Sequence, residues 1–253
     1  MSILVVKEIS KSFGGVQAVA GVSFSVAAGE MLAMIGPNGA GKTTCFNLIS
    51  GQLRPDAGEV FLEEKKIQGL APRELCRLGV GRTFQVTATF GSMSVRENVQ
   101  VALLSHAGRL SSVFSSFSDF FTEEANELLK KVGMEPQAER QSAELAYGDL
   151  KRVELAIALA SRPRLLLMDE PSAGMATAER NELMRLTANL AHESKIAVLF
   201  TEHDMEVVFR HADRVIVLSE GVLIAQGAPA AVRADARVRR VYLGDVGEEA
   251  GDA

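Results

Sequence analysis

Long apolar runs are absent from this chain of 253 residues. The apolar runs are short, such as 196–200, and fall far below the roughly 18 residues that a membrane-spanning helix needs. The first residues have no basic region before a short apolar run and reach an acid at Glu8, which predicts a first strand and no signal peptide. We therefore expect any membrane role to depend on a partner chain.

Cysteine and excess positive charge are also scarce. The two cysteines, Cys45 and Cys76, are too few for a disulfide framework, which fits a reducing compartment. Cys45 follows a glycine-rich segment, and a small buried thiol is the simplest interpretation there. The formal net charge of −5 argues against nonspecific nucleic-acid binding, because a protein that tracks phosphates needs a basic surface.

Material for a hydrophobic core is plentiful. Hydrophobic residues make up 47% of the chain, which argues against disorder. A chain of 253 residues lies near the upper size that one core supports, so we expect a single domain over 1–253 with two lobes.

A glycine-rich motif decides the class of protein. Residues 36–43 match G-x-x-x-x-G-K-[ST] between an apolar run and helix-compatible residues, the context that a phosphate-binding loop requires. Backbone N–H groups of such a loop surround an anion, and the helix directs its positive dipole end at it. We expect Lys42 to reach the β- and γ-phosphates of a nucleoside triphosphate and Thr43 to bind Mg²⁺. The predicted nucleotide-binding residues are Gly36, Pro37, Asn38, Gly39, Ala40, Gly41, Lys42, Thr43 and Thr44.

Short apolar or alternating runs predict the strands. The runs 31–35, 165–168 and 196–200 are continuously apolar, which indicates a parallel sheet covered by helices on both faces. The runs 215–218 and 222–225 flank Ser219-Glu220-Gly221 and predict a hairpin. The predicted strands are 5–9, 22–26, 31–35, 60–62, 165–168, 196–201, 215–218 and 222–225.

The middle of the chain predicts helices. Ser94-Val95-Arg96-Glu97 is a capping box that opens a helix through about residue 104, and 122–132 and 149–160 predict two more. Because nothing between 87 and 160 predicts a strand, we expect a helical block inserted into an α/β domain. The serine-rich segment 109–121 contains phenylalanines that are either core residues or an apolar docking patch: Phe114, Phe117, Phe120 and Phe121.

Two carboxylates follow an apolar strand. Asp169, at the carboxyl end of this strand, is well placed to hold Mg²⁺ through water. Glu170 beside it is the natural base to activate an attacking water. The pair is a weak signal alone and becomes a strong one behind a complete phosphate loop.

Further motifs complete a pattern. Leu145-Ala146-Tyr147-Gly148-Asp149 opens the helix before that strand, Thr83-Phe84-Gln85 precedes the helical block, and Glu202-His203-Asp204 follows a strand. In this order the motifs resemble the ABC ATPase family over about 3–244. The resemblance implies an α/β fold with a phosphate-loop (RecA-like) core lobe, an N-terminal antiparallel β subdomain and an inserted α-helical subdomain. The implied boundaries are about 1–86 and 161–230 for the core lobe, about 87–160 for the helical insert and about 231–253 for a C-terminal helix and tail.

The resemblance also implies roles for single residues. Phe13 matches the aromatic residue that stacks on the adenine of ATP. Gln85 matches the glutamine that contacts Mg²⁺ and the attacking water, and His203 matches the switch histidine that contacts the γ-phosphate. The implied catalytic residues are Glu170, His203 and Gln85, and the implied Mg²⁺ contacts are Thr43, Gln85 and Asp169.

The family's chemistry uses two copies of this site. The phosphate loop of one subunit faces the signature segment of the other, here Ala146, Tyr147, Gly148 and Asp149. Ala146 replaces a consensus serine and removes a hydroxyl donor. Asp149 replaces a glutamine and brings negative charge towards a triphosphate, which we expect Lys151 and Arg152 to moderate. The segment 171–176 lacks the aspartate that members often carry.

The Leu-Ala-Tyr-Gly signature, Ala173-Gly174-Met175 and Tyr242-Leu243-Gly244 resemble the ATP-binding subunits of branched-chain amino-acid uptake systems. This implies an ATPase, peripheral to the cytoplasmic face of the inner membrane, that drives an importer for these amino acids or a related small polar solute. Its implied partners are transmembrane permeases, a second ATPase subunit and, indirectly, a solute-binding protein, with no nucleic acid. Two alternatives stay open: a soluble mechanical ABC ATPase, and a subunit of a lipid- or lipopolysaccharide-extracting system.

Overall fold

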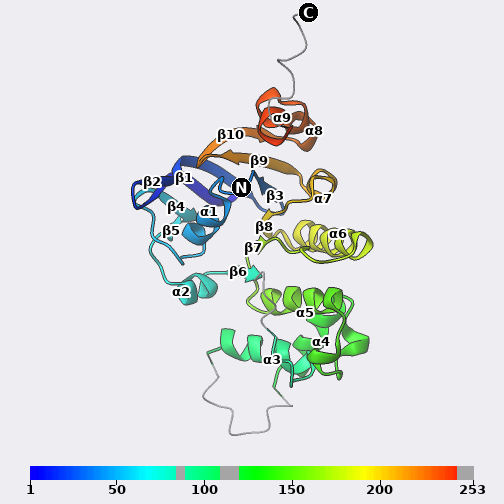
Figure 1. The fold of residues 1–253 in the computed structure, drawn as a ribbon. Coiled ribbons are helices and arrows are strands. Elements are labelled where there is room, and N and C mark those ends of the chain that lie inside the picture. Colours follow the sequence, from blue (N-terminus) through cyan, green and yellow to red (C-terminus); the bar gives the residue numbers. More distant parts are fainter. Residues whose placement is uncertain (84–88, 109–119, 244–253) are drawn as a thin grey trace, which may run out of the picture.

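A six-stranded sheet forms the centre of the protein (Figure 1). The structure is a computed structural model that describes residues 1–83, 89–108 and 120–243. The strand order of the sheet is β10-β9-β3-β8-β7-β6, and the neighbours pair in parallel except β10, which runs antiparallel to β9. The strands are β3 (Met31–Ile35), β6 (Val80–Thr83), β7 (Leu165–Asp169), β8 (Ala197–Thr201), β9 (Arg214–Ser219) and β10 (Val222–Gly227).

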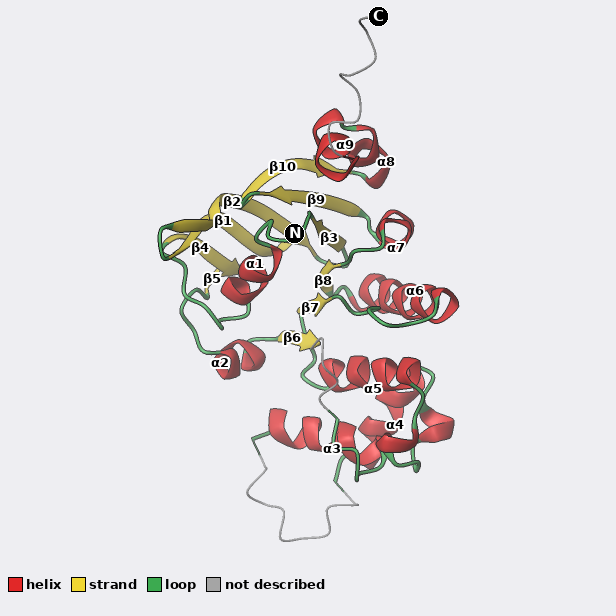
Figure 2. Ribbon diagram, in the orientation of Figure 1, coloured by secondary structure: helices red, strands yellow, loops and turns green. Residues whose placement is uncertain are grey.

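A second, antiparallel sheet covers one side of the first through helix α1 (Lys42–Ile49) (Figure 2). Residues at alternate positions of β3 face opposite ways, so Leu32 and Met34 join the apolar cluster that contains Phe46 of α1. The strands of this sheet, in the order β2-β1-β4-β5, are β1 (Ser2–Phe13), β2 (Val16–Ala27), β4 (Ala57–Leu62) and β5 (Lys65–Lys66).

Helices cover the other face of the central sheet. Met31, Ala33 and Ile35 belong to the apolar cluster on this side, together with residues of the helical block. Figure 1 shows α6 beside β7 and β8, with the helical block beyond it. The remaining helices are α2 (Pro72–Arg77), α3 (Val95–His106), α4 (Thr122–Lys131), α5 (Tyr147–Leu159), α6 (Thr177–Ser194), α7 (Met205–His211), α8 (Pro229–Ala234) and α9 (Ala236–Leu243).

Several local predictions are confirmed. The Ser94 hydroxyl accepts a hydrogen bond from the Glu97 backbone N–H at 3.1 Å, and the Glu97 carboxylate accepts one from the Ser94 N–H at 2.7 Å. The hairpin of β9 and β10 turns through Glu220 and Gly221, both with positive φ, as a tight turn between twisted strands requires. The Cys45 thiol is buried and free.

Other predictions were incomplete. β6 was not predicted, because Gly81 and Arg82 interrupt its apolar pattern, and the mixed sequence of α6 was not recognised as a helix. Phe121 packs against the apolar cluster of the helical block, as a core residue would, while Phe114 and Phe117 lie outside the described residues. Within the described ranges, the structure contains no helix with the length and apolar character to cross a membrane.

Candidate functional site

The loop between β3 and α1 is held in shape by two neighbouring backbones. Gly41 has φ of 98°, and a Cβ there would lie 2.4 Å from the Ala18 carbonyl oxygen of β2. A Cβ at Gly36 would lie 2.2 Å from the Leu218 carbonyl oxygen of β9. Only glycine therefore fits at these positions, and the loop is fixed against both sheets.

Lys42 extends back across this loop. Its ammonium donates hydrogen bonds to the Gly36 carbonyl at 2.6 Å and the Pro37 carbonyl at 3.0 Å. Burial lowers the pKa of Lys42, and the charges of Glu170 and Asp169 act in the opposite direction. The cation is thus placed between the loop and the two carboxylates.

The start of α1 is suited to an anion. Its N-cap residue, Gly41, makes no side-chain hydrogen bond to the helix, and its first turn contains no acidic residue. The positive end of the helix dipole and the backbone N–H groups are therefore not offset by a carboxylate from this helix. Thr43 is exposed in the same turn.

Asp169 is oriented by the neighbouring strands. The Thr201 hydroxyl of β8 donates to Asp169 Oδ1 at 2.7 Å, and Arg82 Nη2 of β6 lies 3.8 Å from Oδ2. Arg82 also donates to Ser50 Oγ at 2.5 Å and to Asn47 Oδ1 at 3.3 Å, next to and within α1. The Arg82 guanidinium thereby connects α1 to the strand end that carries Asp169.

Glu170 contacts His203 directly. Nε2 of His203 lies 2.7 Å from Glu170 Oε1, and the Glu170 backbone N–H donates to Thr201 Oγ1 at 3.0 Å. Glu170 has a φ of 48°, which lies in the left-handed region. This conformation costs a residue with a side chain about 1 kcal/mol or more and is enriched at functional sites. The predicted base and the predicted switch histidine are therefore adjacent.

Phe13 is 46% exposed at the tip of the β1–β2 hairpin, so it is not a core residue. Lys11 Nζ lies 5.7 Å from the centroid of its ring. Strand β2 of the same hairpin also contains Ala18, whose carbonyl faces Gly41. The exposed ring thus belongs to the hairpin that borders the phosphate loop.

The signature segment forms the start of α5, with Ala146 as its N-cap. Asp149 Oδ2 accepts a hydrogen bond from the Gln137 side-chain amide at 3.1 Å. The predicted moderating cations have other partners, since Lys151 pairs with Glu154 at 2.9 Å and Arg152 with Glu182 at 2.8 Å. The Asp149 carboxylate is therefore held by the neutral amide of Gln137, whereas Lys151 and Arg152 form ion pairs with Glu154 and Glu182.

One predicted residue lies outside the described part of the chain. Gln85 falls within 84–88, and the described chain stops at Thr83, the last residue of β6. Among the described residues there is no group of three or more His, Cys, Asp or Glu side chains that could hold a metal ion.

Sequence reasoning missed four residues of this region. Thr201 could have been found, because its strand pairs in parallel with the Asp169 strand and ends at the same edge. Arg82 carries no comparable signal, and Glu202 was noted only as the residue before His203 in its motif. Tyr242 of α9 was noted only as part of a motif. Partial burial raises its pKa to about 12, and a hydrogen bond with the Gly36 backbone acts in the opposite direction.

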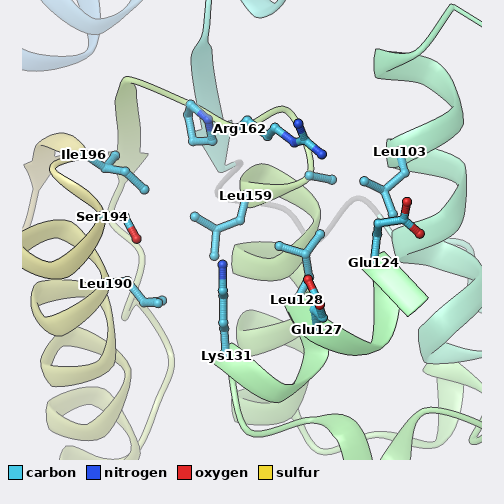
Figure 3. A pocket seen from close by; sticks show the side chains of 12 residues that line it. Leu103, Glu124, Glu127, Leu128, Lys131, Leu159, Arg162, Leu190, Ser194 and Ile196 are labelled. Carbon is cyan, nitrogen blue, oxygen red and sulfur yellow. The ribbon is translucent and has the colours of Figure 1, made fainter. Parts of the chain in front are cut away.

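Two pockets border the helical block, one against α6 and the other against β6 and α2. One, of about 310 Å³, is lined by apolar side chains such as Leu128 and Leu159 and by charged ones such as Glu124 and Arg162, and Lys131 points into it (Figure 3). The other, of about 790 Å³, lies between α2, β6, α3 and α5 and includes Leu75 and Ala102. Neither pocket contains the phosphate loop or Glu170.

Comparison with known protein families gives two matches. The profile described as ABC transporter matches residues 19–173. A second profile, described as Branched-chain amino acid ATP-binding cassette transporter, matches residues 222–248.

Curated relatives match almost the whole chain. The "High-affinity branched-chain amino acid transport ATP-binding protein LivG" of Salmonella typhimurium is 37% identical over 96% of this chain and 98% of its own. The corresponding protein BraF of Pseudomonas aeruginosa is 38% identical, with the same coverage. The "Lipopolysaccharide export system ATP-binding protein LptB" of Escherichia coli is 34% identical over 97% of this chain and 98% of its own.

Solved structures share the fold. The ADP conformation of MJ1267, an ATP-binding cassette of an ABC transporter, superimposes with a TM-score of 0.86 at 32% identity, covering 97% of this chain and 100% of that one. A dimeric structure of the cassette MJ0796 bound to ADP and Pi gives a TM-score of 0.74 at 26% identity, covering 89% and 98%. Because the first profile spans more than half of the chain and relatives match nearly all of it, the chain belongs to the ABC transporter ATPases, which bind and hydrolyse ATP.

Proposed function

We propose that this ATPase is the energy-coupling subunit of a membrane importer for branched-chain amino acids or a related small polar solute. The observation that carries the chemical part is the contact of His203 with Glu170 at 2.7 Å, beside Asp169 and facing the loop of Lys42. The transport part is supported by the 37% and 38% identical relatives and by the match of residues 222–248.

In this proposal the two ends of the site have separate tasks. Lys42 and the N–H groups at the start of α1 bind the phosphates, and the exposed Phe13 ring stacks on the adenine. Glu170 accepts a proton from the attacking water, and His203 orients the Glu170 carboxylate and contacts the γ-phosphate. The strained backbone at Glu170 fixes the direction of the carboxylate.

The residues present fit Mg²⁺. Thr43 and Asp169 supply hard oxygen atoms, and Mg²⁺ in such sites takes most other ligands from phosphates and water, so no cluster of protein ligands is needed. When bound, the ion would neutralise charge on the β- and γ-phosphates. Thr201 and Arg82 hold Asp169 for this role, and we propose Gln85 as a further contact.

The site is completed by a second copy of this chain or by a sister subunit. The chain has one phosphate loop and one signature, and Ala146, Tyr147, Gly148 and Asp149 stand at the start of α5, where N–H groups can face a partner's nucleotide. The dimeric relative bound to ADP and Pi supports this arrangement.

The larger pocket is the proposed docking site for a permease. Apolar side chains of α2, α3 and α5 line part of this hollow of about 790 Å³, beside Arg73, Arg77 and Arg82. It lies between the helical block and β6 of the central sheet. A short helix of a membrane partner fits such a groove and would contact both parts at once. The ATPase would then be held at the cytoplasmic face of the inner membrane through its partner.

Reconstitution tests the transport function. The chain is assembled in vesicles with candidate permeases and a solute-binding protein of branched-chain amino-acid uptake, and ATP hydrolysis is measured with leucine, isoleucine or valine. We expect stimulation by at least one of these amino acids in complexes that also accumulate it. Stimulation by lipopolysaccharide, or by no small solute, would instead favour an extracting system or a mechanical ATPase.

A further inference from the structure

The residues on either side of His203 are both connected to the segment that follows Glu170, Glu202 directly and Asp204 through Arg180. Glu202 is 5% exposed, and its Oε1 accepts hydrogen bonds from the Ser172 backbone N–H at 3.0 Å and the Ser172 hydroxyl at 2.5 Å. Its other oxygen, Oε2, accepts from the His203 backbone N–H at 3.3 Å. One buried carboxylate therefore joins the loop of His203 to the segment 171–176.

A second connection runs parallel to the first. Asp204 caps α7 by accepting from the N–H groups of Glu206 at 2.9 Å and Val207 at 3.3 Å. It also pairs with Arg180 of α6, and Arg180 donates to the Met175 carbonyl at 3.0 Å. The segment 171–176 is thus tied to the loop of His203 near both of its ends.

The hydrogen bonds of the buried Glu202 carboxylate constrain the relative position of the two loops. A carboxylate removed from water needs donors on both oxygens, and hydrogen bonds to a charged acceptor are about twice as strong as neutral ones. The donors of Glu202 come from two loops that are far apart in sequence, so the carboxylate is satisfied only when the loops keep this relative position. Glu170, immediately before the segment, shares that constraint with His203.

We propose that Glu202 is a positioning residue for hydrolysis, which keeps Glu170 and His203 in register by locking the segment 171–176 to the loop of His203. This rests on the proposed roles of Glu170 and His203. Glu202 has no contact with the phosphate loop among its hydrogen bonds, so its effect falls on turnover and not on nucleotide binding. Replacing a residue that only stabilised the fold would lower turnover and nucleotide binding together.

Glu202→Gln is the informative change, because it keeps the size of the side chain and turns one acceptor oxygen into a donor. An amide NH₂ cannot accept a hydrogen bond, so the variant loses either the bonds from Ser172 or the bond from the His203 N–H. Glu30→Gln is a matched control. The Glu30 carboxylate likewise accepts a backbone N–H, that of Ala27 at 2.6 Å, and pairs with Arg214 at the opposite end of β3.

Steady-state kinetics of the purified full chain test the proposal, with binding of a fluorescent ATP analogue measured alongside. We expect kcat to fall at least about tenfold in Glu202→Gln, with affinity for the analogue unchanged within about twofold, because loss of positioning acts on the chemical step. Ser172→Ala should lower kcat less, since the Ser172 backbone donor remains. The double variant should equal Glu202→Gln, because both changes act on the same contact between Glu202 and Ser172.

Three results would overturn the proposal: a kcat for Glu202→Gln equal to that of Glu30→Gln, an equal loss of analogue binding, or additive effects in the double variant. If Glu202→Gln does not fold, Ser172→Ala alone decides, and an unchanged kcat contradicts the proposal. Glu170→Gln is measured in parallel. Normal turnover in that variant would refute the proposed function itself, whereas its inactivity beside a normal Glu202→Gln would refute only the role of Glu202.

Discussion

His203 and Glu170 meet across the carboxyl edge of the central sheet, with the imidazole Nε2 2.7 Å from the carboxylate Oε1. The two residues lie in loops that follow neighbouring parallel strands, β7 and β8. The Thr201 hydroxyl, which contacts both Asp169 and the Glu170 backbone, connects these strand ends. The proposed base and the histidine proposed to orient it are therefore brought together by the sheet.

Lys42→Ala should weaken nucleotide binding by about tenfold to a hundredfold, because a charge-assisted contact to the phosphates disappears. Titration with a fluorescent ATP analogue measures the change. Lys66→Ala, which removes an exposed lysine paired with Glu59, serves as the control and should bind normally. Unchanged affinity in Lys42→Ala would show that the loop is not the phosphate site.

The Cys45 thiol should resist alkylation in the folded protein. Burial raises its pKa from 9.0 to about 12, so the reactive thiolate is scarce at pH 8–9. Mass spectrometry after iodoacetamide treatment should find Cys45 unmodified until denaturant is added. Rapid modification of the native protein would contradict its burial.

The same shift predicts a pH dependence of stability. The folded chain retains the Cys45 proton between the unfolded pKa and the folded one, where the unfolded chain loses it. Since the unfolded state then binds fewer protons, the free energy of unfolding falls as pH rises from about 9 towards about 12. Urea titrations of wild type and Cys45→Ala across this range should show a smaller fall in the variant.

Asp149→Gln should strengthen ATP-driven dimerisation about two- to fivefold at low salt, because the carboxylate is held by the neutral amide of Gln137 and repels a partner's triphosphate. Loss of the acid near the start of α5 should lower stability by about 0.3–1 kcal/mol. Analytical ultracentrifugation in a Glu170→Gln background measures the dimer. Equal or weaker dimerisation would show that Asp149 serves only its own helix.

How far sequence predicts this structure depends on the kind of contact. The sequence predicts both ends of β3 correctly, because a continuous apolar run between a turn and a phosphate loop is typical of a buried strand. β6 was missed, since a charged residue such as Arg82 argues against a buried strand until its contacts with Asp169 and Ser50 are known.

The same distinction applies to the residues of the candidate site. Lys42, Asp169 and Glu170 follow from motifs because their positions are set by the ends of regular elements. The bond between Glu202 and Ser172 depends on how two loops fold against each other, and no periodicity or spacing encodes that. The ion pairs of Lys151 with Glu154 and of Arg152 with Glu182 likewise belong to the tertiary structure, and the moderation of the Asp149 charge by these cations stays a prediction.

The most direct test of the account is Glu170→Gln, measured for ATP turnover and for its oligomeric state with Mg²⁺ and ATP. If Glu170 is the base, turnover should fall at least about a hundredfold, since general-base catalysis contributes about that much or more. The variant should still bind Mg-ATP and should remain a closed dimer in analytical ultracentrifugation, because the nucleotide is not consumed. A variant that stays monomeric with ATP and hydrolyses it at the wild-type rate would contradict the account.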